Sequence, residues 1–210
     1  MTEYPRLILG SSSPHRRLLL ARFGVPFEVS VPDIDESALP GERPEALVDR
    51  LARAKAAAVA ARHPDAIVIG SDQVAVLDGQ IYGKPHTHAR AVQQLSRAAG
   101  RTVHFLTAVC VMAPGGRVVG CETVPTAVHF RPLSADEIEN YLAQESVLAC
   151  AGSFQSEGLG VSLCESMRSD DPTALIGLPL IAVRRLLAEA GLPIPLPARA
   201  MESATSSGNR

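Results

Sequence analysis

The sequence lacks an excess of charge of either sign. Its 210 residues include 20 lysines and arginines against 22 aspartates and glutamates, a formal net charge of −2 at pH 7. Domains that bind nucleic-acid polymers usually carry a clear excess of basic residues, because the phosphate backbone dominates their affinity. We therefore expect no nucleic-acid polymer among the partners of this chain. Any basic residues that matter for its function must act locally.

The sequence also lacks long apolar runs. No uninterrupted apolar stretch approaches the roughly 18 residues that cross a bilayer as a helix. The first residues, Met1 to Arg6, are mostly polar and lead directly into a strand-like segment, so they do not have the form of a secretory signal. These absences predict a cytoplasmic protein with no membrane partner.

Closely spaced cysteine pairs are missing as well. The four cysteines are Cys110, Cys121, Cys150 and Cys164, and no two of them form a C-x-x-C motif. This spacing argues against a zinc knuckle and a thioredoxin-like redox motif. Because cytosolic thiols are normally kept reduced, we expect all four to be buried free thiols.

Strand-like and helix-like segments alternate along the chain. The expected strands are 6–10, 27–31, 66–70, 74–77, 81–82, 102–112 and 118–130, and the expected helices are 14–23, 44–62, 87–98, 135–143 and 180–190. A turn at Asp78-Gly79 joins two of these strands into a hairpin and adds an antiparallel portion. The pattern predicts a mixed α/β sheet with a cleft. We expect a single domain over residues 1–197 and a disordered tail at 198–210.

A serine-rich loop, Ser11-Ser12-Ser13-Pro14, connects the first strand to the first helix. Free backbone N–H groups and the helix dipole at such a helix start favour an anion. Arg16 and Arg17 follow in the first helical turn, where positive charge opposes the dipole unless an anion is bound. The loop therefore suits a phosphate chain. The alternative is that both arginines point to solvent or pair with acids.

Lys55 is the only charged residue on the apolar stripe of its helix, which is formed by residues 48, 51, 52, 55 and 59. Its side chain either extends along the core to solvent or points into an internal cleft. Asp72 follows a buried strand, and ligands of α/β sheets gather at the carboxyl ends of strands. There it would hold Mg²⁺ or Mn²⁺ or take a proton from water, unless it only forms a turn.

Lys84 and Glu157 are two further candidates. Lys84 lies in Tyr82-Gly83-Lys84-Pro85, which is not a P-loop, and Pro85 favours an extended backbone at Lys84. Glu157 lies in a glycine-rich loop, residues 152–160, where its carboxylate can accept hydrogen bonds from a guanine edge. The alternative is an ordinary surface loop with a solvated acid. Taken together, the candidates suit phosphoryl chemistry on a nucleotide.

Two segments resemble the signatures of the Maf family. They are Leu7-Ile-Leu-Gly-Ser-Ser-Ser-Pro-His-Arg-Arg-Leu-Leu-Leu20 and Gly70-Ser-Asp-Gln-Val-Ala-Val-Leu-Asp-Gly-Gln-Ile-Tyr-Gly-Lys-Pro85, and the resemblance extends over about residues 6–190. It implies a nucleoside triphosphate pyrophosphatase, a hydrolase that releases a monophosphate and pyrophosphate. It also implies a mixed twisted sheet in two lobes with a central cleft, similar to inosine triphosphatases, a homodimer, and a divalent cation, Mg²⁺ or Mn²⁺.

The same resemblance implies roles for individual residues. Asp72 is the expected proton acceptor and metal ligand, and Glu36 a second metal ligand. The phosphates are expected to contact Ser11, Arg16, Arg17, Lys55 and Lys84. A non-catalytic nucleotide-binding regulator of septum formation is an alternative, although such a protein would not need a carboxylate beside the phosphates.

The branch of the family is indicated by Gln73, by the loop at 152–160 and by the segment 171–179, which resemble the YceF-type proteins that prefer 7-methyl-GTP. The other main branch acts on dTTP and UTP and usually carries threonine where Gln73 stands. His15, Gln73 and Glu157 are the residues expected to tune base choice. His15 replaces a tryptophan that is usual in the branch, and a smaller ring stacks less well on a cationic base.

Overall fold

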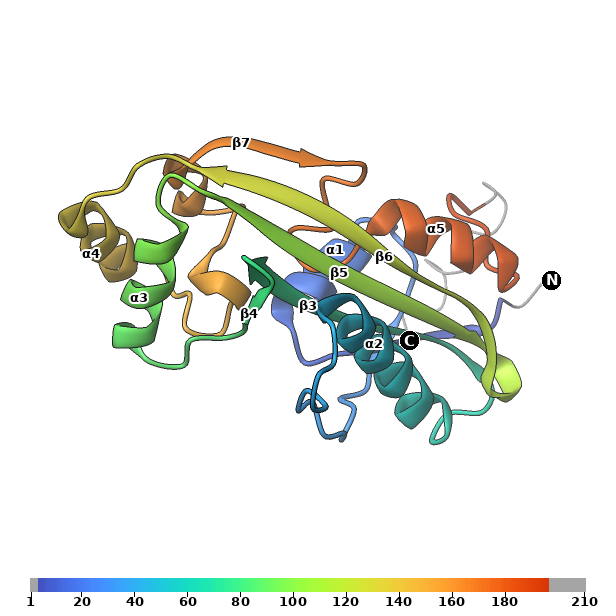
Figure 1. The fold of residues 1–210 in the computed structure, drawn as a ribbon. Coiled ribbons are helices and arrows are strands. Elements are labelled where there is room, and N and C mark those ends of the chain that lie inside the picture. Colours follow the sequence, from blue (N-terminus) through green and yellow to red (C-terminus); the bar gives the residue numbers. More distant parts are fainter. Residues whose placement is uncertain (1–3, 197–210) are drawn as a thin grey trace.

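The computed structural model describes residues 4–196 (Figure 1). Their helices are α1 (Pro14–Ala21), α2 (Pro44–Ala60), α3 (His88–Ala98), α4 (Ala135–Gln144) and α5 (Leu180–Glu189), with short 3-10 turns η1 (Pro114–Gly116), η2 (Ala151–Ser153) and η3 (Leu159–Leu163). Their strands are β1 (Arg6–Gly10), β2 (Glu28–Val29), β3 (Ala66–Leu77), β4 (Gln80–Tyr82), β5 (Thr102–Ala113), β6 (Arg117–Phe130) and β7 (Cys164–Ser169). The tail expected to be disordered lies outside the described residues.

All seven strands form one mixed sheet in the order β2-β1-β3-β5-β6-β7, with β4 paired to β3. β1 runs parallel to β2 and β3, whereas the remaining neighbours are antiparallel. The expected mixed α/β class is confirmed. β3 differs from the expectation, because it continues through Asp72 as one strand where two short strands were predicted.

The helices gather at two ends of the long strands β5 and β6 (Figure 1). α1 and α5 cover one face of the sheet and α2 covers the other, while α3 and α4 lie together at the far end. Alternating residues of β3 supply both faces: Ile67 and Ile69 join the core under α1 and α5, and Val68 joins the core under α2. This arrangement gives the molecule two lobes joined by the sheet.

Gly70 allows α2 to lie directly on β3. A Cβ atom at this position would overlap the backbone of Ala52 and lie 2.9 Å from the Cβ of Ala56. Backbone approach as close as this is open only to glycine. Because Lys55 lies between those two alanines on α2, the contact at Gly70 sets how closely Lys55 approaches β3.

Cys110 and Cys121 form a disulfide between β5 and β6. The expectation that all four cysteines are free is therefore wrong for this pair. The antiparallel register places the two residues directly opposite each other, which their 11-residue spacing did not reveal. Cys150 and Cys164 are free and half-buried.

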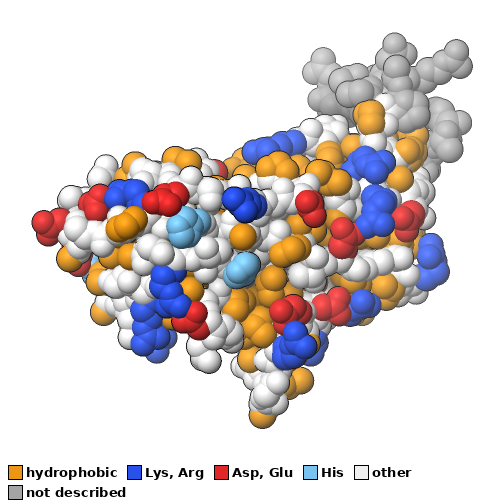
Figure 2. All heavy atoms as spheres, turned by 45° about the horizontal axis from the view of Figure 1, so that its top comes forward, with side chains coloured by type: hydrophobic (Ala, Val, Ile, Leu, Met, Phe, Trp, Pro, Cys, Tyr) orange, Lys and Arg blue, Asp and Glu red, His pale blue; other side chains and the backbone are white. Residues whose placement is uncertain are grey.

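The surface carries both signs of charge. Lysine and arginine side chains are interspersed with aspartate and glutamate over the face that Figure 2 shows, as the near-zero net charge leads one to expect. Within residues 4–196, no helix has both the length and the hydropathy needed to cross a bilayer.

Candidate active site

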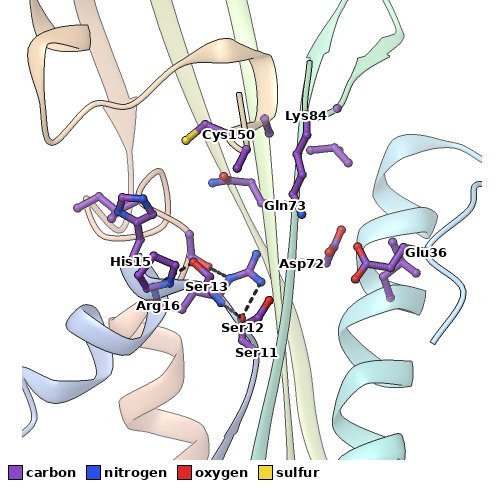
Figure 3. A pocket seen from close by; sticks show the side chains of 18 of the residues that line it. Ser11, Ser12, Ser13, His15, Arg16, Glu36, Asp72, Gln73, Lys84 and Cys150 are labelled. Atoms are coloured by element: carbon purple, nitrogen blue, oxygen red, sulfur yellow. Dashed lines mark hydrogen bonds between the residues drawn. The ribbon is translucent and has the colours of Figure 1, made fainter. Parts of the chain in front are cut away.

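A cleft of about 920 Å³ opens between the two lobes. Its walls come from the start of α1, the segment before α2, α2 itself, the middle of β3, the loop after β4, the loop around η2, and residues 175–177. These segments are far apart in the sequence, and the sheet brings them together (Figure 3). Every candidate residue except Arg17 lines the cleft.

The cleft passes a break in the pairing along one edge of β3. β1 pairs with β3 only as far as Gly70, and β4 begins its pairing at Ala75. Among the described strands, none covers Ser71 to Val74 on this edge, although β5 covers the other edge throughout. Both faces of β3 are therefore open to the same cleft, so the adjacent residues Asp72 and Gln73 line it from opposite faces (Figure 3).

Lys55 joins two carboxylates on the α2 face of β3. Its Nζ lies 2.6 Å from Oδ1 of Asp72 and 2.9 Å from Oε1 of Glu36. Lys55 and Asp72 are only 5% and 7% exposed, so the side chain of Lys55 points into the cleft and does not extend to bulk solvent. A buried charge needs such partners, because its transfer from water costs several kcal/mol.

Glu36 is held in its ionised form by nearby cations. Burial by itself would raise the pKa of Glu36, but the hydrogen bond from Lys55 and the charges of Lys55, Lys84 and Arg16 together lower it below its ordinary value. The carboxylate is thus negative at neutral pH, beside the carboxylate of Asp72. This cluster offers oxygen atoms to a cation on one side of the cleft.

The serine loop and Arg16 form the opposite wall. Ser13 caps α1, and its Oγ accepts a hydrogen bond from the backbone N–H of Arg16 at 3.4 Å. The guanidinium of Arg16 donates to the carbonyl of Gly177 at 2.8 Å and to Oγ of Ser11 at 3.4 Å. Burial lowers the pKa of Arg16, an effect that the charges of Asp72 and Glu36 oppose. A half-buried guanidinium facing a cleft suits an anionic ligand.

Arg17 and Lys84 are placed differently from each other. Arg17 is exposed and does not line the cleft, so the structure separates the two neighbouring arginines. Lys84 is also exposed, but its side chain reaches from the loop after β4 into the pocket, above Asp72 (Figure 3). Arg16, Lys55 and Lys84 therefore bring three positive charges to the cleft.

His15 and Glu157 meet across the cleft on the other face of β3. Nδ1 of His15 lies 2.8 Å from Oε1 of Glu157, and both side chains are partly exposed. Glu157 is held in place through its loop, in which the backbone N–H of Leu159 donates to Glu145 at 2.9 Å. His15 and Gln73 thus lie on the side of β3 away from Asp72 and Glu36 (Figure 3), and Glu157 joins them through its contact with His15.

The geometry places Lys55, Asp72 and Glu36 on one face of β3 and His15, Gln73 and Glu157 on the other. A family model described as "Maf-like protein" matches residues 6–190. The chain belongs to the Maf family. It is 56% identical over 193 residues to a "7-methyl-GTP pyrophosphatase" of Aromatoleum aromaticum, an alignment that covers 92% of this chain and 100% of that protein.

Other Maf relatives carry the same name. A "7-methyl-GTP pyrophosphatase" of Nitrosococcus oceani is 54% identical over 190 residues, covering 90% of this chain and 96% of that protein. A third, from Pseudomonas aeruginosa, is 53% identical over 191 residues, covering 91% of this chain and 100% of that protein. Among solved structures, a nucleoside-triphosphatase / dITP/XTP pyrophosphatase from Mycobacterium abscessus matches at TM-score 0.42 and 17% identity, covering 90% of this chain and 98% of that one.

The donor set of this Maf chain fits a divalent cation that is shared with a substrate. Within the described residues, no group of three or more His, Cys, Asp or Glu side chains is close enough together to hold a metal. Asp72 and Glu36 supply two carboxylates around one point, which Lys55 occupies. Mg²⁺ is commonly bound by one or two carboxylates together with substrate phosphates. These two residues would therefore hold it together with phosphate oxygens.

One part of the site was not identified from the sequence. Residues 171–177, here called the carbonyl loop, direct backbone oxygens at Arg16 and at β3: Gly177 accepts from Arg16 and from the buried Ser71, and Ala174 and Leu175 accept from Gln73. The sequence indicates only that this segment is typical of the branch, because these four contacts join residues more than 100 positions apart. The local signal was Asp171-Pro-Thr173, in which Asp171 accepts from the backbone N–H of Thr173 in an Asx turn.

Proposed function

We propose that this chain is a metal-dependent nucleoside triphosphate pyrophosphatase that hydrolyses 7-methyl-GTP, or a related modified nucleotide, to the monophosphate and pyrophosphate. The observation that carries the proposal is the buried Lys55–Asp72 contact inside a cleft that Arg16 and Lys84 also line. A carboxylate surrounded by cations suits attack on a phosphate chain. The names of the relatives at 53–56% identity support the same reaction and base.

The triphosphate would lie between the walls that carry the three cations. Arg16 and Lys84 approach it from opposite walls, and Lys55 approaches from α2. The hydroxyl of Ser11 and the start of α1 add donors for phosphate oxygens. Arg17 is left out of this assignment because its side chain is exposed and outside the cleft.

Asp72 would act as the general base. Its Oδ1 accepts a hydrogen bond from Lys55, so Oδ2 is the atom that takes the proton of the attacking water. The water oxygen bonds to the α-phosphorus, and the bond from this phosphorus to the bridging oxygen breaks. Pyrophosphate leaves with that electron pair. When bound by Asp72 and Glu36, Mg²⁺ or Mn²⁺ supplies positive charge that offsets the charge on the leaving group.

The base would lie on the opposite face of β3, among His15, Gln73 and Glu157. A 7-methylated guanine carries a positive charge, and the carboxylate of Glu157 is attractive to it. His15 already contacts that carboxylate, so binding of the base rearranges or extends this pair. A homodimer in the cytoplasm belongs to the same proposal through the family resemblance, and light scattering after size-exclusion chromatography tests the dimer.

Pyrophosphate release from a panel of nucleotides tests the proposal. The panel holds 7-methyl-GTP, GTP, dTTP, UTP and CTP, each with Mg²⁺ or Mn²⁺, and EDTA-treated protein serves as the blank. We expect rapid release from 7-methyl-GTP and slower release from the others. Activity confined to dTTP and UTP would place the chain in the other branch. Binding without release from any of them would favour a nucleotide-binding regulator.

A further inference from the structure

The side-chain amide of Gln73 is held by three oxygen atoms. One amide atom lies 2.9 Å from Oγ1 of Thr107, 3.1 Å from the carbonyl of Ala174 and 2.9 Å from the carbonyl of Leu175. Thr107 faces Gln73 directly across the β3–β5 pair and is fully buried. These contacts together fix which end of the amide faces the cleft.

The chemistry of the three partners determines which amide atom of Gln73, Nε2 or Oε1, they surround. Two of them are carbonyl oxygens, which only accept hydrogen bonds. The third, the hydroxyl of Thr107, donates its own hydrogen to the carbonyl of Ala174 at 2.8 Å, so toward Gln73 it must accept. The atom that they surround is therefore Nε2, the donor, and Oε1 is directed away from them.

Oε1 of Gln73 is open to the cleft. It accepts no hydrogen bond from any described residue, and no buried side-chain N or O atom of these residues lacks a partner. An unpaired atom in this half-buried, cleft-lining residue is therefore accessible from the cleft. The free end of Gln73 is an acceptor.

The carbonyl loop that holds Nε2 is itself fixed. Asp171 is 2% exposed, and its carboxylate accepts from Thr173 and from the backbone N–H of Ile181 at 2.7 Å. The hydroxyl of Thr173 accepts from the backbone N–H of Leu180 at 2.8 Å. These bonds tie the loop to the first turn of α5. The carbonyls that hold Gln73 therefore cannot turn away without disturbing that helix.

We propose that Thr107 is a positioning residue for base selection, which locks Gln73 so that the base side of the cleft offers acceptors: Oε1 of Gln73 and the carboxylate of Glu157. This proposal rests on the proposed function. Two acceptors match an edge that carries neighbouring N–H donors, as guanine does with N1–H and its 2-amino group, with or without the 7-methyl group. Uracil and thymine place carbonyl oxygens on both sides of their single N–H, so they fit poorly. Hypoxanthine, which lacks the 2-amino group, leaves one acceptor unpaired.

The substitution Thr107→Val tests the proposal because it keeps the shape and removes the hydroxyl. We expect the wild type to prefer GTP over inosine triphosphate by about tenfold or more in kcat/KM, as for one base-edge contact. In Thr107→Val the amide loses its anchor on β5 and the Ala174 carbonyl loses the donor that holds it, so Gln73 should be held less firmly and this ratio should fall severalfold. Thr107→Ser, which restores a hydroxyl, should recover the ratio.

Two further variants make the result specific. Thr126→Val removes another buried threonine hydroxyl, which contacts Ser169 outside the cleft, and should leave the ratio unchanged. Gln73→Met should lower the ratio as Thr107→Val does, and the double variant should lower it no further. A ratio unchanged in folded Thr107→Val, no recovery with serine, or additive effects in the double variant would overturn the proposal.

The same comparison can be made by binding, which separates this inference from the proposed reaction. Calorimetry with the α,β-methylene analogues of GTP and inosine triphosphate gives the ratio of the two affinities without turnover. If the wild type releases no pyrophosphate but binds the guanine analogue more tightly, and Thr107→Val loses that preference, the reaction is wrong and the inference holds. Equal affinities in the wild type would contradict the inference alone.

Discussion

Lys55 holds together two carboxylates that would otherwise repel each other. Asp72 and Glu36 both contact its ammonium group, and Lys55 and Asp72 are almost fully buried. The shared ammonium group offsets this repulsion and fixes where both carboxylates lie. It therefore positions the residue proposed as base.

Replacing Asp72 with asparagine should abolish that function and preserve the fold. An asparagine Oδ1 can still accept from Lys55, but the amide cannot take a proton, so we expect turnover of 7-methyl-GTP to fall about 100-fold or more. Pyrophosphate release gives the rate, and thermal unfolding checks the fold. Asp49→Asn, which breaks the exposed pair with Arg53, is the matched control. Near-normal turnover in Asp72→Asn would remove Asp72 from the mechanism.

For single residues, the sequence predicted which side chains serve the site better than it predicted which residues each of them contacts. Lys55 on an apolar stripe and Asp72 after a strand pointed to a cleft, because a charge in those places needs a partner. Arg16 and Arg17 could not be told apart, since their exposure depends on how α1 sits against Gly177. Thr107 gave no signal at all, because its partners come from distant parts of the chain.

The contact between α2 and β3 is the element-scale feature on which the site depends. Gly70→Ala would force the helix backbone at Ala52 and Ala56 away from the strand. We expect a loss of about 1–3 kcal/mol in the free energy of unfolding and a loss of activity, since Lys55 moves with the helix. Urea unfolding and pyrophosphate release measure the two effects.

Gly120→Ala is the control for this substitution. A Cβ at Gly120, on β6, would meet only the end of the Leu186 side chain, which can turn aside. It should therefore cost less stability and leave activity intact. If both variants behaved alike, close backbone approach at Gly70 would not be what positions Lys55.

The segment that carries Glu36 is clamped to α2 by Arg50. Its guanidinium bonds both oxygens of Glu42 and the carbonyl of Ser37. The bonds from Arg50 and the backbone N–H of Leu39 lower the pKa of Glu42 to about 2. Because the pKa of Glu42 is lowered, its contacts contribute their full stabilisation of the fold above the ordinary pKa of 4.5. This contribution is lost as the pH falls toward 2.

A comparison of the wild type with Glu42→Gln should show this dependence. The difference in their free energies of unfolding should stay constant near neutral pH and shrink as the pH falls from about 4.5 toward 2. Urea unfolding at a series of pH values measures it. A difference that stayed constant through that window would mean that the Glu42 carboxylate does not hold the segment.

Most helices were predicted within a few residues, because their caps and apolar periodicity are local. Ser134, for example, forms the capping box with Glu137 that its sequence suggests. β3 was divided wrongly, since Asp72 and Gln73 are poor strand formers when considered alone. Pairing with β5 overrides that local preference, and the same strand pairing places Cys110 opposite Cys121.

For the whole molecule, the cleft between the lobes has a consequence for metal binding. Lys55 occupies the point between Asp72 and Glu36, so a free divalent cation has to displace it. A metal that arrives with a triphosphate meets less resistance, because Lys55 can turn to a phosphate oxygen. Activity should therefore vanish in EDTA.

Thermal unfolding tests this order of binding. We expect Mn²⁺ alone to shift the Tm very little, and Mn²⁺ with the α,β-methylene analogue of GTP to raise it by more than the sum of the separate shifts. The analogue with EDTA serves as the control. An equally large shift from Mn²⁺ alone would show that the two carboxylates bind the cation unaided.

The fold class could be predicted because strand-like and helix-like apolar segments alternate along the sequence, and this order determines that helices pack on a sheet. The break along the edge of β3 could not, since it depends on where β1 stops and β4 starts against the same strand. The last β1–β3 pair joins Gly10 to Gly70, whereas β4 returns to β3 through the turn at Asp78-Gly79, so the break depends on separate segments.

Because one edge of β3 is unpaired from Ser71 to Val74, this strand can present side chains for two separate roles. Asp72 and Gln73 are neighbours along the backbone, yet the pleat directs them to opposite faces, one toward the proposed phosphate site and one toward the proposed base site. Under this proposal, a change of side chain at position 73 would alter which nucleotide is accepted without moving Asp72, the proposed base. A family built on such a strand would be free to exchange its substrates while it kept a single reaction.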